Sequence, residues 1–160
     1  MGRRTAVVLL ILISLSSVSL ALDGDGFVSV STFTTKGIIV PEGQGRNFFW
    51  GTGYKAEDYW TPTKKDVLKA EKKLVEYLKE EKPELSPELW KKAAKYNRQY
   101  VGVVIMADKK IWINFFDRSV DHPKWRKEPV LVDGGGDRYF NVLYDVSGEK
   151  FFNLQVNALL

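Results

Sequence analysis

The sequence contains no cysteine and only one histidine among its 160 residues. The absence of cysteine excludes disulfides, thiolate metal ligands and any lipid anchor attached through a cysteine. Because His122 is the lone imidazole and no histidine or carboxylate pair has ligand spacing, we expect neither a zinc site nor another cofactor. The folded chain must therefore obtain its stability from packing alone.

The sequence also lacks a strong excess of positive over negative charge. The chain has 24 lysines and arginines against 20 aspartates and glutamates, and loss of Arg3 and Arg4 with a leader would lower the basic residues to 22. Binding to nucleic acid or to anionic membranes requires clustered positive charge. We therefore predict that the mature chain binds neither nucleic acid nor a membrane.

The first 21 residues have the organisation of a secretory signal peptide. Arg3-Arg4 gives a basic start, residues 6–15 are almost wholly apolar, and Ser19 and Ala21 place small residues at positions −3 and −1 of a cleavage site. An uncleaved anchor helix is the alternative, although the segment is near the lower limit for spanning a bilayer and contains several serines. We predict cleavage after Ala21 and a secreted or periplasmic mature chain.

Residues 22–160 are predicted to form one domain, because their number suits a single hydrophobic core. Within it, residues 22–62 form an N-terminal segment with a possible edge strand and an aromatic-rich loop. Residues 63–160 form a core of helices followed by strands. The loop contains Phe48-Phe49-Trp50, which we expect to pack on the core because an exposed cluster of this kind would promote aggregation.

Helical periodicity begins after Pro62. Thr63 and Asp66 have the spacing of a capping box, and apolar residues then recur at steps of three and four. The predicted buried positions of this long helix are Val67, Ala70, Leu74, Tyr77 and Leu78. Ser86-Pro87 is typical of a second helix start, and this shorter helix is expected to end near Tyr96.

Strand-like alternation follows the second helix. The predicted strands cover residues 100–106, 111–116, 130–132, 139–146 and 149–157. The fold class is therefore predicted as α+β, with one long and one short helix packed on a curved antiparallel sheet of four to five strands. A one-residue bulge is expected at Gly102 or Asn114, because glycine and asparagine are depleted in regular strands.

Residues two apart in a strand share a face of the sheet, so the alternation predicts two faces. The face expected to lie under the long helix is apolar and contains Val101, Val103, Ile105, Ile111, Ile113, Phe115, Phe140, Val142, Tyr144, Val146, Phe152, Leu154 and Val156. The opposite face mixes amides with aromatic rings and has almost no charge. Its candidate binding residues are Trp112, Asn114, Phe116, Asn141 and Gln155.

Carboxamides beside flat rings suit neutral polar ligands, because rings cover area while amides both donate and accept hydrogen bonds. The sequence thus predicts a non-catalytic domain that binds a protein, peptide or glycan, with Trp112 at least partly accessible. The other interpretation of the same pattern is an ordinary sheet face covered by the aromatic loop.

Catalytic residues are not predicted. Ser119, Asp121 and His122 occur in one loop, but catalytic triads assemble from separated segments, so His122 is expected to be exposed or to fasten the loop. The functional alternative that stays open is a small exported hydrolase that uses Asp117, Asp121 or Asp133. Such enzymes require two carboxylates set across a cleft.

Two resemblances accompany these patterns. The helix and meander of residues 63–157 resemble the cystatin-like arrangement, and Arg98-Gln99-Tyr100-Val101-Gly102 is similar to the Gln-x-Val-x-Gly motif of cystatin inhibitors. One residue of that motif is missing and the segment begins a strand, so the resemblance implies the fold and not inhibition. This segment also resembles small exported bacterial proteins of no assigned activity, together with Ile113-Asn114-Phe115-Phe116, Trp125, Pro129–Gly135 and Leu154–Asn157. That second resemblance implies export and a single domain only.

Overall fold

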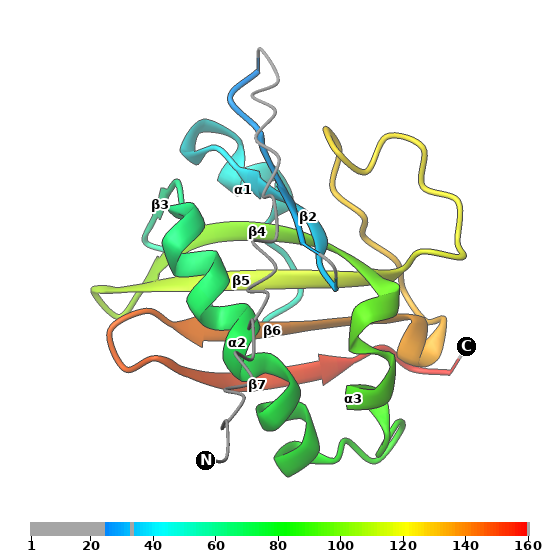
Figure 1. The fold of residues 1–160 in the computed structure, drawn as a ribbon. Helices are drawn as coiled ribbons and strands as arrows, with labels where there is room; N and C mark the ends of the chain where they lie inside the picture. Colours follow the sequence, from blue (N-terminus) through cyan, green and yellow to red (C-terminus); the bar gives the residue numbers. More distant parts are fainter. Residues whose placement is uncertain (1–24, 33, 160) are drawn as a thin grey trace, which may run out of the picture.

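A computed structural model of the chain describes residues 25–32 and 34–159, and it has α+β architecture (Figure 1). The predicted signal peptide, residues 1–21, lies outside the described residues. The elements in chain order are β1 (Val28–Ser31), β2 (Lys36–Val40), the 3-10 turn η1 (Glu42–Gln44), α1 (Gly45–Phe48), β3 (Asp58–Trp60), α2 (Lys64–Glu81), α3 (Leu89–Lys92), η2 (Ala93–Lys95), β4 (Tyr96–Ile105), β5 (Asp108–Asp117), η3 (Gly136–Arg138), β6 (Tyr139–Asp145) and β7 (Lys150–Val156).

One mixed, mostly antiparallel sheet of seven strands organises the molecule. The strand order is β1-β2-β4-β5-β6-β7, and β3 pairs with the second half of β4 on the same side as β2. The pairing of β2 with β4 is parallel, and α2 lies in the connection between them. The expected sheet of four to five strands was too small, because the N-terminal segment contributes three strands instead of one possible edge strand.

The long helix α2 confirms its sequence signals. Thr63 Oγ1 accepts a hydrogen bond from the Asp66 backbone amide, and Asp66 accepts one from the backbone amide of Thr63, which completes the capping box. The helix lies across one face of the sheet (Figure 1) and buries Val67, Ala70, Leu74 and Leu78. Tyr77, the fifth predicted position, is only partly buried. Its apolar stripe packs against side chains of β4 to β7. The second helix, α3, is a single turn followed by a 3-10 turn.

A buried ion pair joins α2 to the sheet. Arg98 Nε on β4 donates to Glu71 Oε1 over 2.9 Å, and the Tyr100 hydroxyl donates to the same carboxylate. Burial and the Glu71 charge raise the pKa of Tyr100 well above its usual value. Arg98 and Tyr100 therefore help to orient α2 on the sheet.

The predicted assignment of β4 to the face under α2 was wrong. Val101, Val103 and Ile105 lie on the opposite side, in the cluster that contains Trp112. The cause is the turn between β4 and β5, whose two residues Met106 and Ala107 both have positive φ (52° and 63°). A two-residue turn of this kind pairs Ile105 with Asp108 and so fixes the register of the hairpin.

The expected bulge lies on another strand. The register between β6 and β7 shifts between Asn141 and Leu143, next to Asn153, which has φ of 54°. The shift moves Phe152 away from α2 and brings Phe151 under it, so the predicted placement of Phe152 was wrong. Gly102, where a bulge was expected, instead allows close approach of β3: a Cβ added there would lie 2.1 Å from the Trp60 carbonyl oxygen.

Residues 130–132 do not form the predicted strand. Their backbone is bonded instead to side chains of the sheet: Val130 binds the amides of Gln99 and Asn114, and the Val132 carbonyl accepts from Asn157. Side-chain amides thus replace the neighbouring strand that this apolar run would otherwise require. Among the described helices, none is long and apolar enough to cross a membrane.

Candidate functional site

A row of four carboxamides crosses the sheet on the side away from α2. Gln99 of β4 faces Asn114 of β5, Asn114 faces Asn141 of β6, and Asn141 faces Gln155 of β7. We call this side of the sheet the amide face. Asn114, Asn141 and Gln155 were predicted to share it, and the structure brings them together. Gln99 was missed because the assignment of β4 was inverted.

The side chain of Gln99 forms hydrogen bonds to the backbone of a loop that lies against the sheet. Its Nε2 donates to the carbonyl oxygens of Trp125 (2.7 Å) and Glu128 (2.8 Å), and its Oε1 accepts from the Val130 amide (3.1 Å). Asn114 Nδ2 donates to Gln99 Oε1 and to the Val130 carbonyl. Both amides are buried, so these bonds hold the loop of residues 122–130 against the sheet.

A second loop is fastened at the other end of the row. Asn153 and Gln155 both donate to the Thr52 carbonyl oxygen, over 3.0 and 3.2 Å. Phe49, from the aromatic loop, packs edge-on against the Trp112 ring with centroids 5.8 Å apart. The aromatic loop therefore covers this part of the amide face, as the alternative interpretation of the sequence pattern expected.

The predicted accessibility of Trp112 was wrong. Its side chain is 1% exposed, and Phe116 and Asn114 are buried as well. The covering loops cause this burial, and the Trp112 indole nitrogen donates to Asn141 Oδ1 over 3.1 Å. Asn141 and Gln155 are the two predicted site residues that stay partly exposed.

An opening remains where the two covering loops approach each other. This Trp50 notch has a volume of about 30 Å³. Its walls include Trp50, Leu131, Asn114, Asn141 and Asn157. At its rim Trp50 is 54% exposed and Leu131 is 43% exposed. The expectation that Trp50 packs on the core with Phe48 and Phe49 was therefore wrong, and Leu131 was not predicted as a site residue. The density of aromatic residues around Trp50 was the signal that could have identified it.

The amides inside the Trp50 notch are only partly satisfied. The orientation of Asn141 is fixed by the indole donor of Trp112, which leaves its Nδ2 directed elsewhere, and Asn114 uses only its Nδ2. Within the described part of the chain, neither Asn141 Nδ2 nor Asn114 Oδ1 has a hydrogen-bond partner. The notch thus offers one donor and one acceptor beside an exposed indole.

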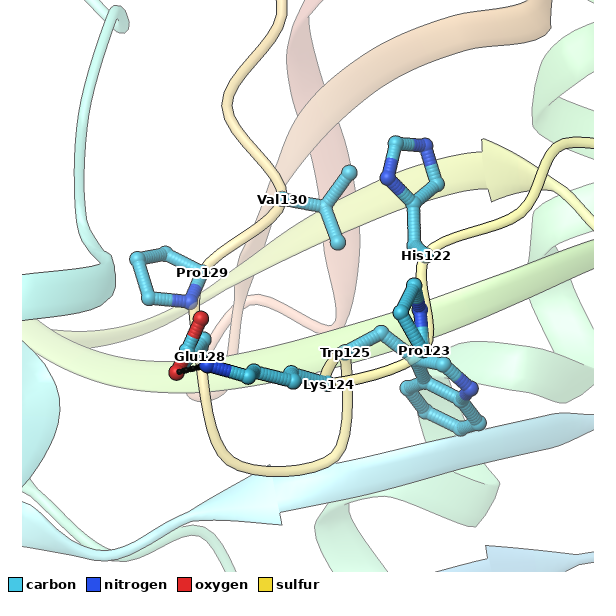
Figure 2. A pocket seen from close by; sticks show the side chains of 7 residues that line it. All are labelled: His122, Pro123, Lys124, Trp125, Glu128, Pro129 and Val130. Atoms are coloured by element: carbon cyan, nitrogen blue, oxygen red, sulfur yellow. Dashed lines mark ion pairs between the residues drawn. The ribbon is translucent and has the colours of Figure 1, made fainter.

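The loop that Gln99 holds also contains a larger pocket of about 180 Å³ (Figure 2). Figure 2 shows the ion pair between Lys124 and Glu128 (3.2 Å) and His122 at the other end of the loop. His122 Nε2 lies 3.1 Å from the Tyr139 hydroxyl oxygen, and its ring packs edge-on against Phe116. His122 thus has the second of the two roles expected for it, because it fastens the loop to β6.

The pocket that contains Asp121 is not lined by the other two carboxylates of the hydrolase alternative. Asp121 lines a pocket beside the loop, and neither Asp117 nor Asp133 lines the same pocket. Asp117 accepts a hydrogen bond from the Ser119 backbone amide. Among residues 25–32 and 34–159, no group of three or more histidine, aspartate or glutamate side chains has a geometry that could hold a metal ion.

Comparison of the chain with protein-family models, with curated proteins and with solved structures gives no match.

Proposed function

We propose that this chain is an exported, non-catalytic domain that binds a neutral polar ligand at the Trp50 notch, and that this ligand is a glycan. The observation that carries the proposal is that two residues lining the notch, Asn141 and Asn114, keep an unbonded donor (Nδ2) and an unbonded acceptor (Oδ1), and that the Trp50 ring beside them is exposed. Ligand binding is thus proposed only for the part of the amide face that the loops leave uncovered.

A sugar hydroxyl matches this arrangement chemically. A hydroxyl both donates and accepts hydrogen bonds, so sugar hydroxyls can satisfy a free amide donor as well as a free amide acceptor. The notch volume is about 30 Å³, which is enough to admit a small polar group such as a hydroxyl. The apolar face of the pyranose ring would lie on Trp50, with Leu131 on the other side.

A peptide is the second ligand class that the amide face supports, because a backbone amide also has one donor and one acceptor. The glycan is favoured because the notch is short and its rim offers an exposed indole instead of a long apolar groove. The cystatin-like arrangement expected from the sequence is likewise a proposal about the fold, and we attach no inhibitor function to it.

The test is affinity for soluble oligosaccharides and for unstructured peptides, measured by calorimetry on the mature chain. Trp50→Ala should lower glycan affinity at least tenfold. Asn141→Asp should lower it as well, because the aspartate keeps the acceptor for the Trp112 indole and replaces the free donor by a second, negatively charged acceptor. Leu85→Ala, at an exposed position outside the notch, is the control.

Two results would contradict this proposal. Binding to peptides alone would replace the glycan by the other ligand class. Unchanged glycan affinity in both Trp50→Ala and Asn141→Asp would show that the glycan does not bind at the notch.

The export proposal has its own test. Cleavage after Ala21 predicts that protein recovered from the extracellular or periplasmic fraction begins at Leu22, which intact-mass spectrometry reads directly. Full-length chain in washed membranes would show an uncleaved anchor instead.

A further inference from the structure

The segment Trp50-Gly51-Thr52-Gly53-Tyr54 has two exposed aromatic rings on either side of a buried residue. Trp50 is 54% exposed and Tyr54 is 39% exposed, whereas Thr52 between them is 4% exposed. A regular extended chain does not produce this order, because residues two apart in it point to the same side. The two residues between them must therefore break the alternation.

Both of these residues are glycines in the left-handed conformation. The φ angle is 75° at Gly51 and 74° at Gly53. A Cβ added to either glycine would meet no other atom within 4 Å, so the positive φ and not a lack of space calls for glycine here. The backbone conformation of the segment thus separates the exposed rings from the buried threonine.

Thr52 fixes the segment to the amide face. Its carbonyl oxygen accepts the two hydrogen bonds from Asn153 and Gln155 of β7, and its Oγ1 accepts a third from the Tyr54 backbone amide over 3.1 Å. The segment is therefore ordered before any ligand arrives. A surface that is preorganised in this way loses less conformational entropy on binding.

The two rings lie at different points along the sheet. Trp50 lines the notch together with Tyr139. The Tyr54 ring packs edge-on against Phe152, with centroids 6.1 Å apart, and Phe152 pairs with Leu143. Tyr139 and Leu143 are four residues apart on β6, which corresponds to about 13 Å along the strand. One pyranose ring is much shorter than this, so only a chain of sugars can contact both rings.

We infer that the ligand is a linear, neutral oligosaccharide and that Tyr54 is a second aromatic platform, which selects for chain length. The inference rests on the proposed function, because it extends the glycan from the Trp50 notch along β7. One sugar unit lies on Trp50, the chain passes over Thr52, and a later unit contacts the Tyr54 ring. None of residues 50–54 carries a charge, which favours a neutral chain.

The experiment measures affinity on the mature chain by calorimetry and, for weak ligands, by NMR titration. Two soluble series are used, β-1,4-linked glucose and β-1,4-linked N-acetylglucosamine, each from the monosaccharide to the hexasaccharide. Affinity should rise about tenfold or more along at least one series, because two contacts within one ligand reinforce each other. It should level off once the chain is long enough to reach Tyr54.

Tyr54→Leu is the test variant, because leucine keeps an apolar contact with Phe152 and removes the flat ring. It should lower the affinity for the hexasaccharide severalfold and leave the affinity for the monosaccharide unchanged. Trp50→Ala should lower both affinities. Tyr54→Phe, which keeps the ring, and Leu85→Ala, at an exposed position outside the notch, should bind as the unchanged chain does.

Failure of this inference is distinguishable from failure of the proposed function. The absence of binding by both series at every length would contradict the glycan proposal and this inference with it. Equal affinities for the monosaccharide and the hexasaccharide would overturn the second platform alone. An equal loss of both affinities in Tyr54→Leu would do the same, because it would show that Tyr54 supports the notch instead of contacting a later sugar unit.

Discussion

Gln99 and Asn114 face each other on adjacent strands, and Asn114 Nδ2 donates to Gln99 Oε1 over 3.2 Å. This contact couples two buried amides whose other bonds all run to the backbone of residues 125–130. The pair thus orders a loop that contains no regular secondary structure. The hydrogen bonds of Gln99 leave none of its side-chain polar atoms without a partner, which favours a well-ordered loop.

Gln99→Leu should consequently destabilise the fold and release the loop. The substitution removes the partners of the Trp125 and Glu128 carbonyls and of the Val130 amide, and each buried group left without a partner costs about 1–3 kcal/mol. Gln155→Leu is the matched control, because Gln155 is partly exposed and donates one bond, to Thr52. Denaturant unfolding should give the larger loss for Gln99→Leu, and amides near Trp125 should exchange faster. Equal losses would contradict the central role of Gln99.

The face of α2 supplies a second comparison. Leu74 is 1% exposed, whereas its neighbour Val75 is 40% exposed. Leu74→Ala should lower the free energy of unfolding by about 2–5 kcal/mol because it leaves a cavity under the helix. Val75→Ala should change it by no more than about 0.5 kcal/mol, the scale of surface substitutions. A reversed order in denaturant unfolding would mean that the helix packs through another face.

Acid stability should depend on Asp145, whose side chain is largely buried. Backbone and side-chain donors at Gly148 and Ser147, together with Lys110 at 2.9 Å, lower the pKa of Asp145 far below its ordinary value. A carboxyl whose pKa is lower in the folded state contributes stability above its unfolded pKa, about 3.9, and loses that contribution as the pH falls toward the folded value.

Asp145→Asn should therefore lower the melting temperature at pH 7, and the difference from the unchanged chain should shrink as the pH falls below about 3.9. Thermal unfolding at pH 7, 4 and 2.5 measures this dependence. Glu76→Gln, at an exposed position on α2, should show no such trend. A difference that stays constant with pH would indicate that Asp145 acts through packing instead of charge.

The sequence predicted the elements whose signals are local. The capping box at Thr63, the buried stripe of α2 and the alternation of β5 and β6 depend on residues close in the chain, and the structure confirms them. The face of β4 was not predictable in the same way, because it depends on how the hairpin turn at Met106 sets the register.

The candidate site was recovered in part for the same reason. Alternation within β5 and β6 correctly placed Asn114 and Asn141 on one face. Whether that face is open depends on loops that reach it from distant parts of the sequence, and the bonds from Gln155 to Thr52 and from Gln99 to Glu128 have no local sequence signal. Burial of Trp112 and exposure of Trp50 are therefore consequences of tertiary structure alone.

Variants at Trp112 and Trp50 allow the effects of burial and of exposure on stability to be compared. Trp112→Ala should lower the free energy of unfolding by about 3–5 kcal/mol, because it removes a fully buried ring and the indole bond to Asn141. Trp50→Ala, at a position that is 54% exposed, should change it by no more than about 0.5 kcal/mol. Denaturant unfolding of both variants gives the comparison, and tryptophan fluorescence adds a check, since the exposed indole of Trp50 should be quenched by iodide and that of Trp112 should not. A small loss of stability for Trp112→Ala would show that the covering loops open readily, and the amide face would then be accessible beyond the Trp50 notch.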